Sequence, residues 1–151
     1  MVGLKMLARR ELSTSQVRER LCKKGFADDE SEPAIRRLQQ EGALDDGRTA
    51  MAFARQALNL KMRGRQRTLR EIQALGIDRR VARVAVDEVY AAVDEGELVE
   101  RVLARRLSGP ISSPAEFRRL YQALLRQGFD SGTVVSALKA HTGPTEPLEL
   151  E

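Results

Sequence analysis

The sequence is short of the residues that build covalent and metal staples. Its 151 residues include one cysteine, Cys22, and one histidine, His141. A disulfide within the chain needs two cysteines, and a structural zinc site needs four Cys or His ligands. The sequence therefore excludes both, and helix packing must supply the stability. We also expect no bound metal ion and no cofactor.

Long apolar runs and catalytic constellations are scarce as well. No stretch approaches the roughly 18 apolar residues that a membrane helix needs, so we expect a soluble, cytoplasmic protein. The segment Met62–Arg65 lacks the glycine pair and the following Lys-Ser/Thr of a phosphate loop. Cys22 lies on an apolar helical stripe, which favours a core residue over a nucleophile. We therefore expect no enzyme. Apolar spacing also places four aromatic residues in the core: Phe26, Phe53, Phe117 and Phe129.

What the sequence has instead is a repeat. Three segments read alike around Gly25, Gly76 and Gly128. In each, an aliphatic residue precedes the glycine by four positions, a large apolar residue follows it, and an aspartate comes shortly after. Glycine readily takes the left-handed conformation that ends a helix, and aspartate caps the next one. Each segment therefore predicts a tight helix-turn-helix. The capping aspartates are Asp28, Asp78 and Asp130.

Apolar residues recur at helical spacing elsewhere, for example in Val81, Val84, Ala85 and Val89, and no segment alternates with the period of a strand. Capping boxes are expected at Ser13 and Ser113, and Ser31 is expected to cap a helix with Pro33 in its first turn. The pattern predicts an all-α fold of three tandem three-helix, helix-turn-helix-like repeats, elongated and modular. Nine helices are expected, at 4–10, 14–24, 31–41, 47–62, 67–75, 79–93, 95–107, 114–127 and 131–140. The predicted repeats are 1–43, 44–94 and 95–141, followed by a flexible tail, 142–151, with a possible expression-vector remnant.

Basic residues are the candidate functional side chains. Lys and Arg total 26 against 22 Asp and Glu, a net charge of +4 that permits nucleic acid binding without requiring it. One group lies in a stretch without acidic residues, partly in an expected extended connection where alternate side chains point one way. The functional interpretation is a patch that binds phosphates or the acidic surface of a partner. The alternative is a solvated linker. Its members are Arg55, Lys61, Arg63, Arg65, Arg67 and Arg70.

Two further basic groups have the same two readings, because cations near a helix C-terminus are also expected from the helix dipole. The group in the first repeat is Arg18, Arg20, Lys23 and Lys24, with Arg9 and Arg10. The group in the third repeat is Arg105, Arg106, Arg118, Arg119 and Arg126.

A series of short segments lies in a fixed order along the chain: Leu7-Ala8-Arg9-Arg10, Ser13, Val17 to Leu21, Lys24-Gly25-Phe26, Leu38, Gly42, Leu44-Asp45-Asp46, Ala52-Phe53-Ala54-Arg55, Lys61 to Arg70 and Gly76-Ile77-Asp78. In their order and spacing these segments resemble the RecX family, regulators of the RecA recombinase, from about Leu4 to His141. One departure is Thr49, at a position where the family usually carries an aromatic residue.

The resemblance implies a monomeric protein that binds RecA and its filament on single-stranded DNA. It implies inhibition of RecA ATP hydrolysis and strand exchange in recombination, DNA repair and the SOS response, with weak direct DNA binding. The alternative from the residues alone is a helix-turn-helix protein that reads duplex DNA. For that alternative the acidic residues after Gly25 are unfavourable, whereas Arg79, Arg80 and Arg83 after Gly76 are suitable.

Overall fold

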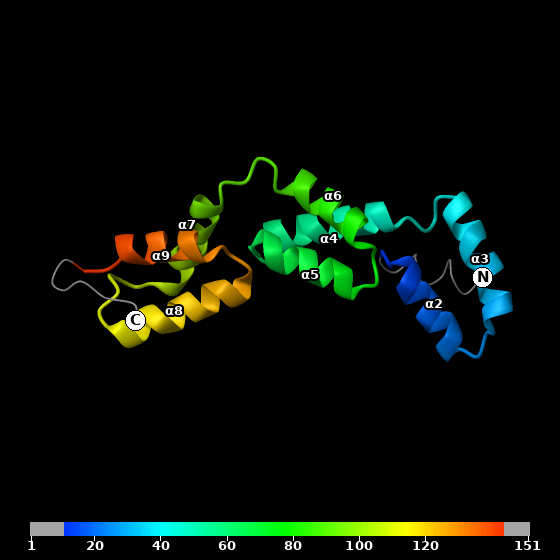
Figure 1. Ribbon diagram of the computed structural model, residues 1–151, viewed down its shortest axis with the longest axis horizontal. Helices are drawn as coiled ribbons and strands as arrows, with labels where there is room; N and C mark the ends of the chain where they lie inside the picture. Colours follow the sequence, from blue (N-terminus) through cyan, green and yellow to red (C-terminus); the bar gives the residue numbers. More distant parts are fainter. Residues whose placement is uncertain (1–10, 144–151) are drawn as a thin grey trace. The chain divides into compact units, whose positions relative to one another are not determined.

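The computed structural model describes residues 11–143, and within them the chain is helical (Figure 1). That part contains no strand beyond one isolated parallel bridge between Ile111 and Thr142. The all-α class is therefore confirmed. The helix expected at 4–10, Arg9, Arg10 and most of the expected tail lie outside the described residues. The helices are α2 Thr14–Lys23, α3 Asp28–Gln40, α4 Asp46–Asn59, α5 Arg65–Ala74, α6 Arg79–Val89, α7 Glu95–Arg106, α8 Pro114–Gln127 and α9 Ser131–Ala140.

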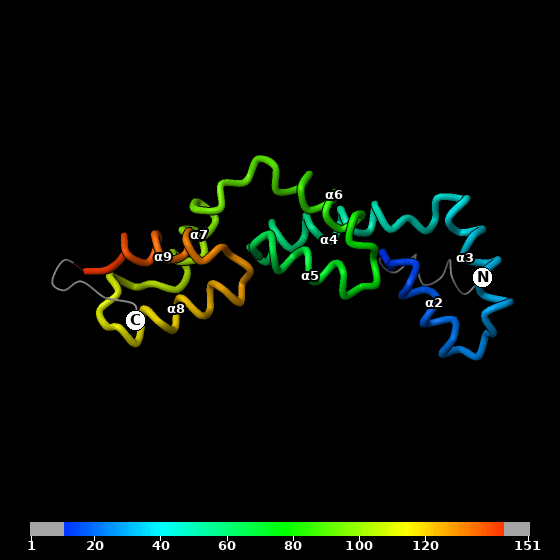
Figure 2. The backbone as a smooth tube through the Cα atoms, in the orientation of Figure 1, coloured from blue at the N-terminus to red at the C-terminus, as the bar shows by residue number. Residues whose placement is uncertain are grey.

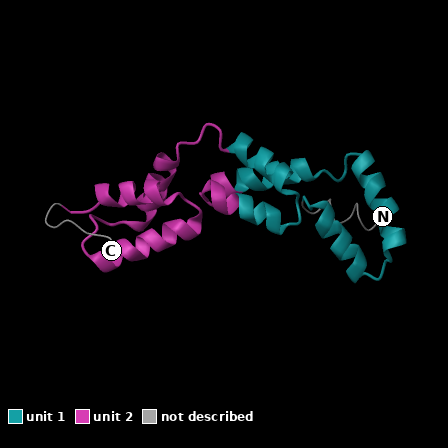
Figure 3. Cartoon of the chain, viewed as in Figure 1, with its two compact units in different colours: residues 1–56, 69–89 teal, residues 57–68, 90–151 magenta. Residues whose placement is uncertain are grey.

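The chain divides into two compact units, coloured separately in Figure 3. The first unit comprises residues 1–56 and 69–89, and the second comprises residues 57–68 and 90–151. Helices α4 and α5 each contribute residues to both units. The division into three repeats follows sequence similarity instead of contacts, and it stays a prediction.

Glycine turns end the helices where the sequence predicts them, and the tube in Figure 2 shows the reversals after α2, α5 and α8. Gly76 and Gly128 have φ values of +82° and +104°. Asp130 caps α9 by accepting from the N–H of Thr133 at 3.2 Å. The aspartate prediction is wrong at the first turn, since Asp28 is the first residue of α3 and Ala27 holds the cap position.

The third helix also begins earlier than expected. Helix α3 starts at Asp28, three positions before Ser31, because acidic side chains favour a helix N-terminus. Ser31 is therefore not a cap: it is buried, and its Oγ has no hydrogen-bond partner among the described residues. Pro33 lies inside the helix beyond the first turn, where its nitrogen has no proton to donate. The capping box at Ser13 is confirmed, and Ser113 accepts from Glu116 N–H at 3.1 Å.

Each unit has its own apolar core. In the first unit Val17 and Leu21 of α2 pack with Ile35 and Leu38 of α3, and Leu44 closes the cluster. Burial of each such side chain stabilises the folded state by about 1.5–3 kcal/mol relative to leaving it exposed to water. The core of the second unit draws on α7, α8 and α9, and its fully buried members include Val99, Leu103, Phe117, Leu124, Val134 and Leu138.

Three residues expected in the core are not there. Cys22 is exposed, so its assignment to the core is wrong. Phe26 is 37% exposed, and Val84, expected on the apolar face of α6, is 65% exposed. The equivalents of Phe26 in the other turns, Ile77 and Phe129, are buried at 3% and 2% exposure. The turn after α2 therefore lacks a covering element that the other two turns have among the described residues.

At the other two turns, the covering element is the start of an earlier helix. We term this contact between a helix start and a glycine turn a glycine joint. In the first unit the start of α2 rests on the turn after α5: Ser13 Oγ donates to the carbonyl of Leu75 at 2.5 Å. A Cβ on Gly76 would overlap the side chain of Ser15. Glycine is therefore required at this turn both for its positive φ and for the close approach.

The second unit contains an equivalent glycine joint. The N–H of Gly64, directly before α5, donates to the carbonyl of Gln127 at 2.9 Å. A Cβ on Gly128 would overlap the backbone and Cβ of Arg67. Nothing lies within 4 Å of the corresponding point at Gly25. The same contact thus occurs once in each unit and is absent at the first turn.

Candidate partner-binding surfaces

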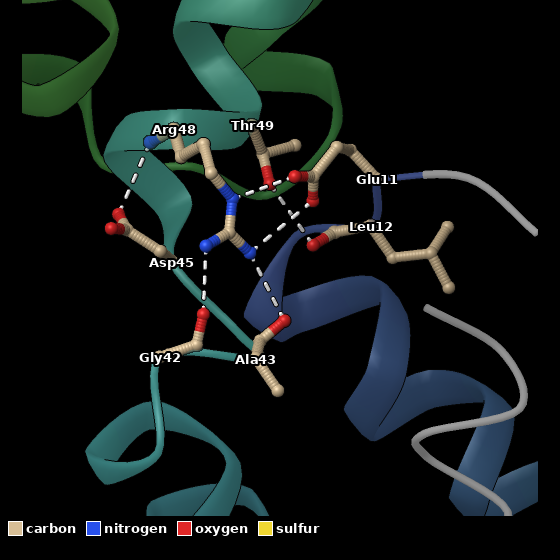
Figure 4. Close-up of polar contacts among 7 residues, drawn as sticks. All are labelled: Glu11, Leu12, Gly42, Ala43, Asp45, Arg48 and Thr49. Atoms are coloured by element: carbon tan, nitrogen blue, oxygen red, sulfur yellow. Dashed lines mark hydrogen bonds and ion pairs between the residues drawn. The ribbon is translucent and has the colours of Figure 1, made fainter. Parts of the chain in front are cut away.

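The Leu44-to-Arg48 stretch that supports the family resemblance has a structural role (Figure 4). Leu44 is buried at 2% exposure, and Asp45 Oδ1 accepts from the N–H of Arg48 at 3.1 Å, which caps α4. Asp46 Oδ1 accepts from the N–H of Thr14 at 2.7 Å and so ties α4 to the start of α2. These residues hold the first unit together, and their side chains are engaged within it.

Arg48 is the centre of this connection. Its Nε donates to Glu11 Oε1 at 2.6 Å, and its two terminal nitrogens donate to the carbonyls of Gly42 at 2.7 Å and Ala43 at 3.1 Å (Figure 4). The hydrogen bond to Glu11 raises the pKa of Arg48 above its ordinary value. Sequence reasoning missed this role, because Glu11 and Arg48 lie far apart in the chain and no local pattern links them.

Thr49 lies in the first turn of α4. It is buried at 3% exposure, and its Oγ1 donates to the carbonyl of Leu12 at 3.2 Å (Figure 4). A hydrogen bond therefore joins α4 to the segment before α2 at this point.

The first candidate group of cations is divided by the structure. Helix α4 ends at Asn59 and α5 begins at Arg65, so only residues 60–64 connect them. The expected extended connection is therefore wrong, because Arg65, Arg67 and Arg70 belong to α5. Arg55 and Arg70 are exposed residues of the first unit. The four cations in the second unit, which we term the connector cations, are Lys61, Arg63, Arg65 and Arg67.

The backbone beneath the connector cations is fixed by hydrogen bonds. The side chain of Gln127 donates to the carbonyls of Lys61 at 2.9 Å and Met62 at 3.2 Å. Tyr90 Oη donates to the carbonyl of Arg63 at 2.8 Å. Met62 is buried and has a left-handed φ of 49°, which is uncommon for a residue with a side chain. Residues 60–64, which we term the connector, therefore form an ordered turn of the second unit and not a loose linker.

Exposure differs among the connector cations. Lys61 and Arg65 are exposed, while Arg63 and Arg67 are half-buried. Arg67 also donates from Nη1 to the carbonyl of Arg126 at 3.3 Å, so part of its hydrogen-bonding capacity is used within the unit. Lys61 and Arg65 are therefore the most exposed of the connector cations.

The second candidate group, on α2, is partly neutralised. Arg18 Nε donates to Glu32 Oε1 at 2.6 Å, and Lys23 lies 3.0 Å from Glu19. The hydrogen bond between Arg18 and Glu32 raises the pKa of Arg18 and lowers that of Glu32. Arg20 is half-buried, and Lys24 is exposed directly after the helix. Two of the four cations thus already have acidic partners, which favours the structural reading of this group.

A metal site and a membrane helix each have requirements that can be compared with the described residues. Within residues 11–143, no group of three His, Cys, Asp or Glu residues is arranged to hold a metal ion. None of the helices described there is long and apolar enough to cross a membrane. His141 follows α9 as its C-cap, and its Nε2 lies 2.6 Å from Glu100 Oε2.

Comparison with known proteins identifies the family. Residues 2–38 match the profile described as RecX, first three-helix domain. Regulatory protein RecX of Thermotoga maritima is 32% identical over 144 residues, covering 95% of this chain and 84% of that protein. Regulatory protein RecX of Chromohalobacter salexigens is 32% identical over 136 residues, covering 90% and 88%.

Solved structures agree on the fold. The crystal structure of RecX from Lactobacillus salivarius matches with a TM-score of 0.71 at 17% identity, covering 92% of this chain and 91% of that one. A second structure, of a regulatory protein RecX, matches with a TM-score of 0.70 at 18% identity, covering 91% and 68%. The sequence relatives and the shared helical fold together show that this chain belongs to the RecX family of regulatory proteins.

Proposed function

We propose that this protein binds RecA and the RecA filament on single-stranded DNA, and that it inhibits RecA ATP hydrolysis, recombinase activity and strand exchange. In this proposal it acts as a cytoplasmic monomer in DNA repair and the SOS response, and it binds DNA directly only weakly. Membership of a regulatory family supports a role in controlling another protein. The proposal needs no cofactor and no catalytic residue.

The observation that carries the proposal is the anchored connector. Hydrogen bonds from Gln127 and Tyr90 fix its backbone, so the exposed Lys61 belongs to an ordered turn that leads directly into α5 and the exposed Arg65. A preordered site loses less conformational entropy on binding than a loose linker does. Cations of this kind attract phosphates or an acidic protein surface and make association depend on salt. A nucleoprotein filament presents both kinds of anionic group.

The test is the rate of ATP hydrolysis by RecA on single-stranded DNA as the protein is titrated in. Binding to bare DNA is measured in the same buffer. We expect the rate to fall at concentrations where bare DNA stays unoccupied. An unchanged hydrolysis rate would contradict the proposal.

A second candidate, direct binding to duplex DNA, is favoured by one observation on α6. Its first residues, Arg79 and Arg80, and the following Arg83 and Val84 are all exposed directly after the turn at Gly76. A recognition helix meets base edges with residues near its N-terminus. Tight, salt-dependent duplex binding that is lost in Arg79→Ala/Arg83→Ala, without inhibition of RecA, would support this candidate instead.

A further inference from the structure

The third group of arginines lines a hollow in the second unit. The hollow has a volume of about 650 Å³ and is formed by α8 with the last turn of α7. Leu120 and Ala123 provide its apolar surface. Glu116 and Gln122 add polar groups to the lining. The four arginines that line it are Arg106, Arg118, Arg119 and Arg126.

These arginines are not explained by contacts within the described part of the chain. All four are exposed, and none forms an ion pair within residues 11–143. The nearest acidic side chain in the lining, Glu116, is engaged: its Oε2 accepts from the N–H and Oγ of Ser112 at 3.1 and 3.2 Å. The hollow is therefore strongly positive.

The helix dipole explains only part of this charge. Arg106 and Arg126 lie in the last turns of α7 and α8, where a cation is favourable. Arg118 and Arg119 lie in the first half of α8, where the dipole gives no such benefit. Arg118 and Arg126 also share one face of α8 with Gln122 between them. The residue between them is uncharged, so no neighbour four positions away on α8 offsets their charge.

We propose that this hollow binds an acidic segment of a protein partner, with carboxylates on the arginines and one apolar side chain on Leu120 and Ala123. Arginine is suited to carboxylates because its planar guanidinium forms two parallel hydrogen bonds with them. The small apolar surface between the cations gives a peptide an anchor as well as a charge contact. The site goes beyond the proposed function, since it can serve any partner that carries such a segment.

Two features of the lining favour a peptide over a nucleic acid strand. No aromatic side chain belongs to the lining, so an unpaired base has no surface on which to stack. Glu116 adds a negative charge to the lining. Every nucleotide carries a phosphate, and the carboxylate of Glu116 repels a phosphate placed beside it. A peptide can instead place a neutral residue at that point.

The experiment measures binding of three fluorescein-labelled probes to the full chain by anisotropy. The first probe is a short peptide with Glu at alternate positions and Leu between them. The second is the same peptide with Gln in place of Glu, and the third is oligothymidine. The test variant is Arg118→Ala/Arg126→Ala. The control Arg36→Ala/Arg101→Ala removes the same charge from exposed positions outside the hollow.

We expect the acidic peptide to bind and the Gln peptide to bind at least tenfold more weakly. The hollow variant should lose about tenfold in affinity for the acidic peptide, and the control variant less than twofold. The variant Arg118→Lys/Arg126→Lys, which keeps charge and helix propensity, should show an intermediate loss because lysine cannot form the bidentate contact.

Three results would overturn the inference. One is failure of the acidic peptide to bind, and another is an equal loss in the hollow and control variants. The third is loss of oligothymidine binding in the hollow variant while acidic peptide binding stays unchanged, which would assign the hollow to nucleic acid. No RecA is present in this assay, so its failure is distinct from failure of the proposed function.

Discussion

Replacing Gly76 with alanine tests the glycine joint of the first unit. Gly76 has a φ of +82°, and an added Cβ would overlap both the Cβ and the Oγ of Ser15. A side chain in the left-handed region costs about 1–2 kcal/mol. The Oγ of Ser15 can rotate away, but its Cβ moves only with the backbone of α2, and overpacking of this kind costs about 1–3 kcal/mol. We expect the free energy of unfolding to fall by about 3 kcal/mol.

Gly25 provides a matched control within the same unit. Its φ is +92°, and nothing lies within 4 Å of an added Cβ. Gly25→Ala therefore costs only the left-handed conformation, about 1–2 kcal/mol. Urea unfolding followed by circular dichroism measures both variants, and hydrogen exchange of α2 and α5 localises the damage. If the two variants lose stability equally, the close approach at Gly76 contributes nothing and the joint is refuted.

Three further predictions concern polar contacts and charge. Thr49→Val leaves the Leu12 carbonyl without its buried donor, so thermal or urea unfolding should show a loss of about 1–2 kcal/mol, and unchanged stability would contradict the hydrogen bond. Arg18 lowers the pKa of Glu32 below its ordinary value of 4.5, so the contribution of Glu32 to stability is present above that value and is lost as the pH falls through the lower folded pKa. In unfolding curves taken between neutral pH and about pH 3, Glu32→Gln should therefore lose less stability on acidification than the unaltered protein does. Replacing a test set of four basic residues by alanine should weaken inhibition of RecA at moderate salt while helicity stays nearly unchanged. Replacing a control set of four exposed arginines elsewhere should change inhibition little. Equal effects of the two sets on inhibition would exclude a specific basic surface. The test set is Arg63, Arg65, Arg67 and Arg70, and the control set is Arg36, Arg37, Arg101 and Arg105.

Local features of the fold were predictable from the sequence because they depend on near neighbours in the chain. A glycine between two amphipathic segments predicts a helix end wherever it occurs, and Gly76 and Gly128 take the expected left-handed conformation. Ser31 and Pro33 have the pattern of a helix start, but the acidic residues from Asp28 onward favour an earlier N-terminus and begin α3.

Features that depend on packing between segments were not predictable in this way. Periodicity gave Cys22, Phe26 and Val84 an apolar face, but it does not say whether another element covers that face. The sequence identified the basic residues, yet it contained no sign that Arg106 of α7 would line one hollow with Arg118 of α8. The anchoring of the connector by Gln127 and Tyr90 likewise arises from contacts between distant residues.

The glycine joints also give the chain a direction. Each joint pairs the start of one helix, which we term the plug, with a later glycine turn, which we term the socket. The start of α2 is paired with the turn after α5, and the start of α5 with the turn after α8. Two pairs are matched, which leaves the socket at Gly25 and Phe26 open and the plug at Ser113 unused within the described residues. Glu116 satisfies the donors of Ser112 beside that plug. The two matched pairs use different donors, the hydroxyl of Ser13 and the backbone N–H of Gly64, so the contact depends on backbone geometry more than on one side chain.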